Sequence, residues 1–351
     1  MRKFLAIVVA ILFIISGIYI HSLYIMVEYV REAQRERGRE FEALRNLAFT
    51  PDTVPYPEAY APSVTDSAPL MLYDVFVNRQ LVASFTDLTD ARSFAEGHTN
   101  ASIFEQNSLS WVWDNHPQFE LHVNNVRILH SSFISAREAA RNYEGAHIVF
   151  RRSGRVVWND NYIRAPYYFI QNVPLILQQP RLPRGCGVVS IGMLINFKGI
   201  EVDKMVLAEE IARHPNNPYK GFIGCMYSWD NWGYGVYHGP IYDLLYKYLP
   251  ERAIDITGAD FEDLYFFIEQ GNPVWVVVNS RYSYLPPYQF FYHRTDDGFV
   301  RLTWRMHAVL ITGFDENYIY FNDPNDVRHQ APKASFIAAW EQMGRQAVTV
   351  S

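Results

Sequence analysis

The chain has two cysteines, Cys186 and Cys225, and a thiol is a candidate nucleophile. Cys186 follows the stretch LPRG and comes just before an apolar run that is typical of a helix. At the start of a helix the backbone N–H groups have no partners and the helix dipole is positive, so a thiol ionises more easily there. We therefore predict that Cys186 is the reactive cysteine.

A thiolate nucleophile also needs an imidazole within hydrogen-bond reach and a group that orients the ring. His307 begins an apolar stretch typical of a strand, and Asp323 ends the next such stretch. With a turn centred after Asp315, position 307 is expected to face position 323 or 324 across the hairpin, at a distance that suits a carboxylate holding an imidazole. This spacing selects His307 among 11 histidines and Asp323 as its partner, with Asn322 as the alternative.

Thiol hydrolysis further needs hydrogen-bond donors for the oxyanion. Gln178 lies eight residues before Cys186, on an extended approach to the predicted helix. Its side-chain amide and the backbone N–H of Cys186 are the predicted donors. Gln179 is the rival, and a role as a surface residue stays open for either glutamine.

An aromatic loop, MYSWDNWGYGVYHGP at 226–240, supplies candidates for substrate binding. Trp229, Trp232 and Tyr234 have large apolar rings with a polar N–H or O–H group, a combination that suits a binding groove partly exposed to water. Packing of the same rings inside the domain explains them equally well.

The elements that position these residues are expected in a domain over 166–351. Helical patterns come first along the chain and strand patterns mostly later, which favours an α+β domain. The predicted helices cover 187–197, 203–213, 238–248 and 260–269, and the predicted strands cover 273–280, 307–314 and 317–323.

Residues 70–162 contain a near-repeat in which Ile103 aligns with Ile148 and Trp113 with Trp158, each pair 45 apart. Each copy has two alternating strands with Asn at the turn, a short amphipathic helix and a second hairpin. This pattern predicts two ββαββ repeats. A spacer or packing module is the preferred role, with target binding as the alternative.

The segment 1–27 contains an unbroken apolar run from Phe4 to Ile20. A helix rising about 1.5 Å per residue crosses a bilayer core of roughly 30 Å within such a segment. We predict an uncleaved transmembrane signal anchor, then a charged juxtamembrane helix over 28–49 and a proline-rich linker over 50–69.

Two rules predict opposite orientations of this anchor in the membrane. Arginines that follow the span, among them Arg31 and Arg35, favour a cytoplasmic C-terminal part under the positive-inside rule. A short positive N-terminus before a long first apolar segment is typical of a signal anchor, and large domains translocate largely regardless of charge. We expect a single-pass protein of the cell membrane with an extracellular catalytic domain.

Composition limits the class of partner. The 351-residue chain is 49% hydrophobic, which is enough for a sizeable core, and its net charge of −6 without a basic stripe excludes nucleic acid as a partner. Cys225, His214 and His238 lack the ligand spacing of zinc motifs, so no metal or cofactor is predicted. A disulfide between Cys186 and Cys225 is an alternative that would block the nucleophile.

At these residues the sequence resembles the cysteine peptidase family 39-like domains, relatives of the bacteriocin-leader (double-glycine) peptidases within the papain-like fold. The family pattern "Q…LPxGCE" is matched by Gln178 and by LPRGC ending at Cys186. The pattern "HAVxxTGxD…NDP" is matched by HAVLITGFD starting at His307 and by the NDP stretch that contains Asp323.

The resemblance covers roughly residues 167–345, and the aromatic loop is similar to the family's Trp-Gly-rich segment. It implies a papain-like α+β fold and thiol-dependent peptide hydrolysis, with the four residues in the roles given above. One position departs from the pattern: Gly187 stands where the family usually carries Glu, so no role of that carboxylate carries over to this chain.

The combined prediction is a membrane-anchored thiol peptidase that acts on a peptide or protein substrate through a Cys-His-Asp triad with a Gln-assisted oxyanion hole. A non-catalytic peptide-binding module on the same fold is one alternative, and a thiol-probe comparison of Cys186 and Cys225 discriminates it. A cell-wall amidase with the same chemistry is the other, and digestion of peptidoglycan separates it.

Overall fold

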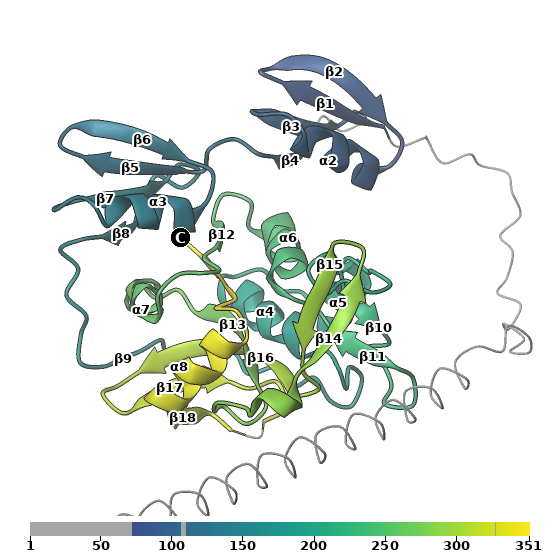
Figure 1. The fold of residues 1–351 in the computed structure, drawn as a ribbon, viewed down its shortest axis with the longest axis vertical. Coiled ribbons are helices and arrows are strands. Elements are labelled where there is room, and N and C mark those ends of the chain that lie inside the picture. Colours follow the sequence, from purple (N-terminus) through teal and green to yellow (C-terminus); the bar gives the residue numbers. More distant parts are fainter. Residues whose placement is uncertain (1–71, 107–109, 327) are drawn as a thin grey trace, which may run out of the picture. The chain divides into compact units, whose positions relative to one another are not determined.

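The computed structural model describes residues 72–106, 110–326 and 328–351, which belong to a compact unit that runs from Leu70 to Ser351 (Figure 1). The predicted anchor over 1–27, the helix over 28–49 and the linker over 50–69 lie outside the described residues. No helix of the described part has the length and apolar character of a membrane span.

The described chain begins with two ββαββ units, drawn in blue to teal in Figure 1. The first comprises β1 (Tyr73–Val77), β2 (Gln80–Phe85), α2 (Leu88–Glu96), β3 (Ala101–Glu105) and β4 (Ser110–Asp114). The second comprises β5 (Phe119–Val123), β6 (Val126–His130), α3 (Phe133–Ala140), β7 (His147–Phe150) and β8 (Arg155–Asn159). Both sheets are antiparallel and have the same strand order, β2-β1-β3-β4 and β6-β5-β7-β8.

Corresponding positions of the two units play the same part in their sheets. Ile103 pairs with Trp113 in the first sheet, and Ile148 pairs with Trp158 in the second. The first hairpin of each unit turns at residues of positive φ, among them Asn78 and Asn124–Asn125, a conformation that asparagine tolerates well.

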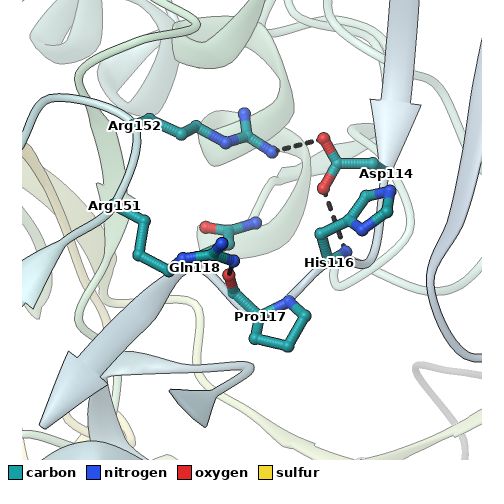
Figure 2. A pocket seen from close by; sticks show the side chains of 6 residues that line it. All are labelled: Asp114, His116, Pro117, Gln118, Arg151 and Arg152. Atoms are coloured by element: carbon teal, nitrogen blue, oxygen red, sulfur yellow. Dashed lines mark hydrogen bonds and ion pairs between the residues drawn. The ribbon is translucent and has the colours of Figure 1, made fainter. Parts of the chain in front are cut away.

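A polar cavity of about 290 Å³ lies where the first unit meets the second (Figure 2). Arg152 Nη2 donates to Asp114 Oδ2 at 2.8 Å, and Arg151 Nη1 donates to the carbonyl oxygen of Pro117 at 2.5 Å. The backbone N–H of His116 donates to Asp114 Oδ1 at 3.0 Å. The ion pair of Arg152 with Asp114 therefore joins the second unit to the end of the first.

The second unit packs on the C-terminal domain. The rings of Phe133 and Phe267 meet edge to face with centroids 5.8 Å apart. Arg137 Nε donates to Asp263 Oδ1 at 2.8 Å, and its guanidinium lies over the ring of Trp158. The buried side chains of both parts form one apolar cluster, so the second unit shares its core with the domain that follows.

The C-terminal domain is built on a seven-stranded sheet of order β12-β19-β13-β16-β17-β18, with β9 beside β16 (Figure 1). Neighbouring strands are antiparallel throughout. In chain order the strands are β9 (Tyr168–Phe169), β12 (Ala253–Asp255), β13 (Val274–Asn279), β16 (Met306–Phe314), β17 (Tyr318–Asn322), β18 (Gln330–Pro332) and β19 (Ala347–Val350).

Helices cover both faces of this sheet because successive strand residues point to opposite sides. On β13, Trp275 and Val277 belong to one apolar cluster together with α4, whereas Val276 and Val278 belong to the other cluster, with α7 and α8. The helices are α4 (Cys186–Phe197), α5 (Lys204–Glu210), α6 (His238–Tyr248), α7 (Phe261–Glu269) and α8 (Lys333–Gln342).

The domain is thus a mixed α/β domain. Its helices α4 to α7 begin within one residue of the predicted positions, while α5 ends at Glu210 rather than 213. Two short strands, β10 (Ile223–Gly224) and β11 (Gly233–Gly235), hold the aromatic loop. A 3₁₀ turn over Pro287–Gln289 leads into a separate hairpin of β14 (Phe291–Thr295) and β15 (Gly298–Leu302).

The hairpin of β16 and β17 has a register that differs from the prediction. Leu310 pairs with Asn322 and Ile311 with Phe321, and an irregularity before Gly313 shifts the pairing by one residue. The ladder ends at the pair Leu310–Asn322, where β17 stops, before His307 is reached, so the predicted direct pairing of 307 with 323 or 324 is wrong. The turn is centred one residue later than predicted, since Phe314 pairs with Ile319, and the bulge before Gly313 corrects this offset only in part.

Candidate active site

Cys186 begins α4, a helix whose first ten residues are all buried. Gly185 occupies the N-cap and offers no side-chain acceptor, so the first-turn N–H groups stay available to the sulfur and to a bound oxyanion. A side chain at 185 would bring its Cβ within 2.7 Å of Leu182 Cβ, which explains the glycine before the cysteine. The thiol is 8% exposed, at the edge of the apolar cluster.

His307 is the second residue of β16, and its ring is 4% exposed. Its Nε2 lies 2.8 Å from Asp323 Oδ1, within hydrogen-bond distance. The Cys186 thiol is close enough to interact with this ring, and the interaction raises the pKa of the imidazole. Because Nε2 is engaged by Asp323, Nδ1 is the nitrogen available to exchange a proton with sulfur.

The environment of His307 favours its charged form. Burial by itself lowers the pKa of the imidazole, but the interactions with Asp323 and Cys186 outweigh burial and raise the pKa to about 9. A protonated imidazole beside the sulfur in turn stabilises a thiolate. The imidazole is therefore largely protonated near neutral pH.

Asp323 is 1% exposed, yet three donors surround its carboxylate. Besides His307, the backbone N–H of Asn325 donates to Oδ1 at 2.8 Å and the Tyr282 hydroxyl donates to Oδ2 at 2.7 Å. Burial raises the pKa of this carboxyl, but the bonds with His307 and Tyr282 outweigh it and hold the pKa below the usual range. The carboxylate thus stays ionised at neutral pH.

Asp323 reaches His307 although the ladder between β16 and β17 has already ended. The chain turns directly after β17, where Asp326 N donates to the Asp323 carbonyl at 2.9 Å, and this turn directs the carboxylate toward the ring. Asn322, the alternative orienting residue, instead donates to the carbonyl oxygens of Val173 and Pro174. The structure therefore selects Asp323 over Asn322 as the partner of His307.

Gln178 is 2% exposed, while Gln179 is exposed, so the structure separates the two candidates. The Gln178 backbone N–H donates to the Pro324 carbonyl at 2.8 Å, which ties the glutamine to the turn that follows Asp323. Its Nε2 donates to the Pro183 carbonyl at 2.5 Å. An amide nitrogen has two hydrogens, so this bond engages only one of them.

Two buried hydrogen bonds join α4 to the strands behind it. Ser190 Oγ donates to the carbonyl of Ala308, the residue after His307, at 3.1 Å. Trp275 Nε1 donates to the carbonyl of Gly187, the residue after Cys186, at 2.9 Å. These bonds hold the start of α4 in a fixed position relative to β13 and β16.

The three aromatic candidates have different surroundings. Trp229 and Trp232 are 63% and 55% exposed, and the guanidinium of Arg184 lies 4.7 Å from the centre of the Trp229 ring. Tyr234 is buried, with its hydroxyl 2.9 Å from that of Tyr237. The packing interpretation therefore fits Tyr234, while both tryptophans are open to a ligand.

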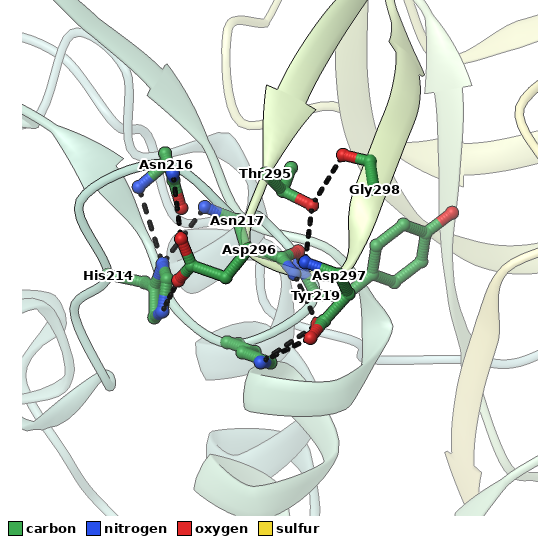
Figure 3. Close-up of polar contacts among 9 residues, drawn as sticks. His214, Asn216, Asn217, Tyr219, Thr295, Asp296, Asp297 and Gly298 are labelled. Carbon is green, nitrogen blue, oxygen red and sulfur yellow. Dashed lines mark hydrogen bonds and ion pairs between the residues drawn. The ribbon is translucent and has the colours of Figure 1, made fainter.

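The hairpin of β14 and β15, which leads into β16, is held at its tip by the loop between α5 and β10 (Figure 3). Asn216 Nδ2 donates to Asp296 Oδ1 at 3.2 Å, and Asn217 Nδ2 donates to Asp297 Oδ2 at 3.0 Å. Lys220 Nζ pairs with Asp297 at 2.8 Å. These contacts restrain the segment that enters the strand of His307.

Sequence reasoning missed Tyr282, Phe291 and Trp304. Tyr282 contacts Asp323, and Trp304 stacks on Phe291 and meets the ring of Tyr234 edge to face. Tyr282 and Trp304 lie in connecting segments, and Phe291 lies in a hairpin strand that was not predicted. The stretch RYSYLPPY around Tyr282 has no helix or strand period, so no local signal identified it.

Cys186 and Cys225 are both free thiols, so the alternative of a disulfide between them is wrong. Within the described ranges, no group of three or more His, Cys, Asp or Glu side chains is arranged to hold a metal ion.

Comparison with known proteins agrees with this geometry. A model of the Peptidase_C39 like family matches residues 170–348. The chain is 36% identical over 183 residues to the uncharacterized protein YvpB of Bacillus subtilis (strain 168), a match that covers 50% of this chain and 72% of that protein.

A crystal structure of a Bacillus anthracis protein described as a C39-like peptidase is also similar. It shares 38% sequence identity and a TM-score of 0.52, and the match covers 53% of this chain and 98% of that chain. The matched region contains all the candidate triad residues and excludes the two ββαββ units. The chain therefore belongs to the Peptidase_C39 like family, through a domain that occupies its C-terminal half.

Proposed function

We propose that this protein is a cysteine peptidase that hydrolyses peptide bonds with Cys186 as nucleophile. The observation that carries the proposal is the buried chain of contacts from Asp323 through His307 to the Cys186 thiol. Each contact supports a role: Asp323 orients the ring, His307 Nδ1 exchanges the proton, and Cys186 Sγ attacks.

In the first half of the reaction the Cys186 thiolate attacks the carbonyl carbon of the scissile peptide bond. A bond forms between sulfur and carbon, and the carbonyl oxygen becomes an oxyanion that accepts from Gln178 Nε2 and the Cys186 backbone N–H. The intermediate then collapses, the carbon–nitrogen bond breaks, and His307 gives its proton to the leaving amine. The product is a thioester on Cys186.

In the second half a water molecule attacks the thioester. His307, now neutral, takes a proton from this water as it adds to the carbonyl carbon. The carbon–sulfur bond breaks, the acid product leaves, and the imidazolium and thiolate form again. The same oxyanion donors act in both halves.

Labelling of the full chain with iodoacetamide tests this proposal. We expect Cys186 to react at least about tenfold faster than Cys225 at about pH 6, since only Cys186 has a partner that stabilises the thiolate at that pH. His307→Ala should remove this advantage. Mass spectrometry of the two cysteine peptides gives the rates separately.

Substrate assays complete the test. Dye-labelled casein should be hydrolysed by the wild-type chain and not by Cys186→Ser. Equal, slow labelling of both cysteines with no hydrolysis would contradict the peptidase and favour the peptide-binding module, for which the exposed Trp229 and Trp232 are the supporting observation. Release of peptides from purified peptidoglycan, with casein left intact, would identify the amidase instead.

We also propose that residues 1–27 anchor the protein in the cell membrane, with the catalytic domain outside. The apolar run from Phe4 to Ile20 supports the anchor, and the short positive N-terminus before it supports the outside placement. Protease added to intact cells that express the chain should digest the region 72–351. Protection of that region until the cells are opened would contradict the proposed orientation.

A further inference from the structure

Tyr282 lies in the loop that follows β13, next to the start of β16. Because β13 and β16 are antiparallel, with Asn279 paired to Met306, the end of one strand lies beside the beginning of the other. This pairing places a residue 25 positions before His307 at the same site. The tyrosine is 3% exposed, and its hydroxyl donates to Asp323 Oδ2 at 2.7 Å.

The backbone at Tyr282 is in the left-handed region, with φ at 53°. A residue with a bulky side chain seldom adopts this conformation, because its Cβ comes too close to the backbone carbonyl oxygen that follows. The surrounding structure holds it there: Tyr282 N donates to the Asn279 carbonyl, and Asn279 Nδ2 donates to the Ser283 carbonyl at 2.8 Å. Strain kept in place by neighbours is a common feature of functional sites.

The ring of Tyr282 packs on two phenylalanines, Phe321 and Phe336, and meets the His307 ring edge to face. Packing alone needs only the ring. The hydroxyl is satisfied by a single acceptor, the carboxylate oxygen that does not face His307. The two oxygens of Asp323 are thus assigned to different donors.

We propose that Tyr282 is a positioning residue for the thiol reaction: its hydroxyl fixes the rotation of the Asp323 carboxylate so that Oδ1 stays on His307 Nε2. This inference rests on the proposed function, since it concerns the same triad. Without the hydroxyl the carboxylate would lose one of its three donors and could turn about its Cβ–Cγ bond. The imidazolium would then lose its fixed acceptor.

Tyr282→Phe tests the inference, because it keeps the ring and removes only the hydroxyl. The measurement is the rate of iodoacetamide labelling of Cys186 against pH in the full chain. With one donor fewer, the pKa of Asp323 rises and the carboxylate becomes neutral earlier as pH falls. We expect the acid limb of the labelling profile to move up by about half a pH unit or more, so that the labelling rate well below the midpoint of this limb falls about threefold or more.

Tyr162→Phe is the matched control. Its hydroxyl also donates to a carboxylate, Glu269 Oε1 at 2.6 Å, on an element that carries none of the triad residues. This variant loses a hydrogen bond of the same chemistry, so we expect a similar loss of stability and an unchanged labelling profile. A purely structural role of Tyr282 would make the two variants alike, with lower melting temperatures and no shift of the acid limb.

A double-mutant cycle with Asp323→Asn gives an independent readout. If Tyr282 acts through Asp323, adding Tyr282→Phe to Asp323→Asn should produce no further change in the profile. Equal effects of Tyr282→Phe in both backgrounds, or a Tyr282→Phe profile that matches the wild type, would overturn the inference and leave the proposed function intact. Slow labelling of Cys186 in the wild type itself would overturn both.

Discussion

The ionisation of His307 depends on its buried contacts, which makes the site sensitive to pH. The raised pKa, from 6.5 to about 9, means that the folded protein holds this proton more tightly than the unfolded chain. The stabilisation is therefore full below about pH 6.5 and is lost as pH rises through about 9. The imidazolium needed to protonate the leaving amine disappears over the same range.

We predict that peptidase activity falls above about pH 9 and that the free energy of unfolding decreases between about pH 6.5 and pH 9. Urea unfolding of the wild type and His307→Ala at about pH 6 and about pH 9.5 measures the stability part. The difference between the two proteins should shrink at the higher pH. A difference that is the same at both values would contradict the assigned proton affinity.

The environment of Gly187 explains its departure from the family pattern. A Cβ at this position would lie 3.2 Å from Val236 Cγ1 and within 4 Å of the side chains of Ile241 and Trp275, all of them apolar atoms. A side chain that begins here would start in tight contact with apolar groups. The missing glutamate therefore matches the apolar surroundings of this chain.

Gly187→Glu should lower the free energy of unfolding by about 2–4 kcal/mol, because a buried unpaired carboxyl is costly. Gly187→Ala adds only a methyl group and is expected to cost less. Chemical denaturation of both variants checks the prediction. A fully stable Gly187→Glu protein with faster labelling of Cys186 would show instead that the glutamate has a place here.

At the scale of elements, the site depends on one helix and one strand that meet through Ser190. Its hydroxyl donates to the Ala308 carbonyl, so the start of α4 is held beside the start of β16. Cys186 and His307 lie on these two elements. The two residues that form the bond, Ser190 and Ala308, are 118 positions apart in sequence. Rigid elements hold a site more closely than loops do.

Ser190→Ala should cost about 1 kcal/mol of stability, the usual loss for one buried hydrogen bond between neutral groups, and should slow Cys186 labelling measurably. Ser135→Ala is the control, because Ser135 Oγ donates only to the Ser132 carbonyl within the second ββαββ unit. It should leave labelling unchanged. Equal labelling rates for the wild type and Ser190→Ala would argue against this bond as a support of the site.

At the scale of the whole described molecule, the second ββαββ unit shares the core of the C-terminal domain and is not a separate body. Asp263 is 3% exposed on α7, and Arg137 of α3 is its cationic partner at 2.8 Å. Burial raises the pKa of Asp263 even though the Arg137 hydrogen bond opposes the rise. The Arg137 cation therefore offsets part of the cost of burying the Asp263 carboxylate.

Arg137→Ala should lower the free energy of unfolding by about 3 kcal/mol, since it leaves a buried carboxylate without its cation. Arg141→Ala removes a neighbouring pair, Arg141 with Asp260, in which both side chains are largely exposed, and should cost less than about 1 kcal/mol. Urea denaturation of the two variants measures the contrast. Similar small losses would mean that the second unit is only loosely attached.

The sequence by itself determined much of the chemistry of this protein. The glycine and the apolar run around Cys186 place the thiol at a helix start, and these signals are local, carried by residues within one or two turns. The positions of α4 to α7 followed from periodicity in the same way. The spacing of the predicted hairpin selected His307 and Asp323, and the family motifs supported both of them together with Gln178; the matched region 170–348 contains all three.

Only the tertiary structure decided how the partners meet. The turn between β16 and β17 lies one residue later than predicted and the ladder stops at Asn322, so the Asp323 contact depends on the turn after β17 and not on direct pairing. Tyr282 joined the site because β13 lies beside β16, and Tyr234 proved to be buried because Tyr237 and Trp304 pack around it. Such contacts join residues far apart in sequence, and their positions follow from the packing of the sheet, which no local pattern encodes.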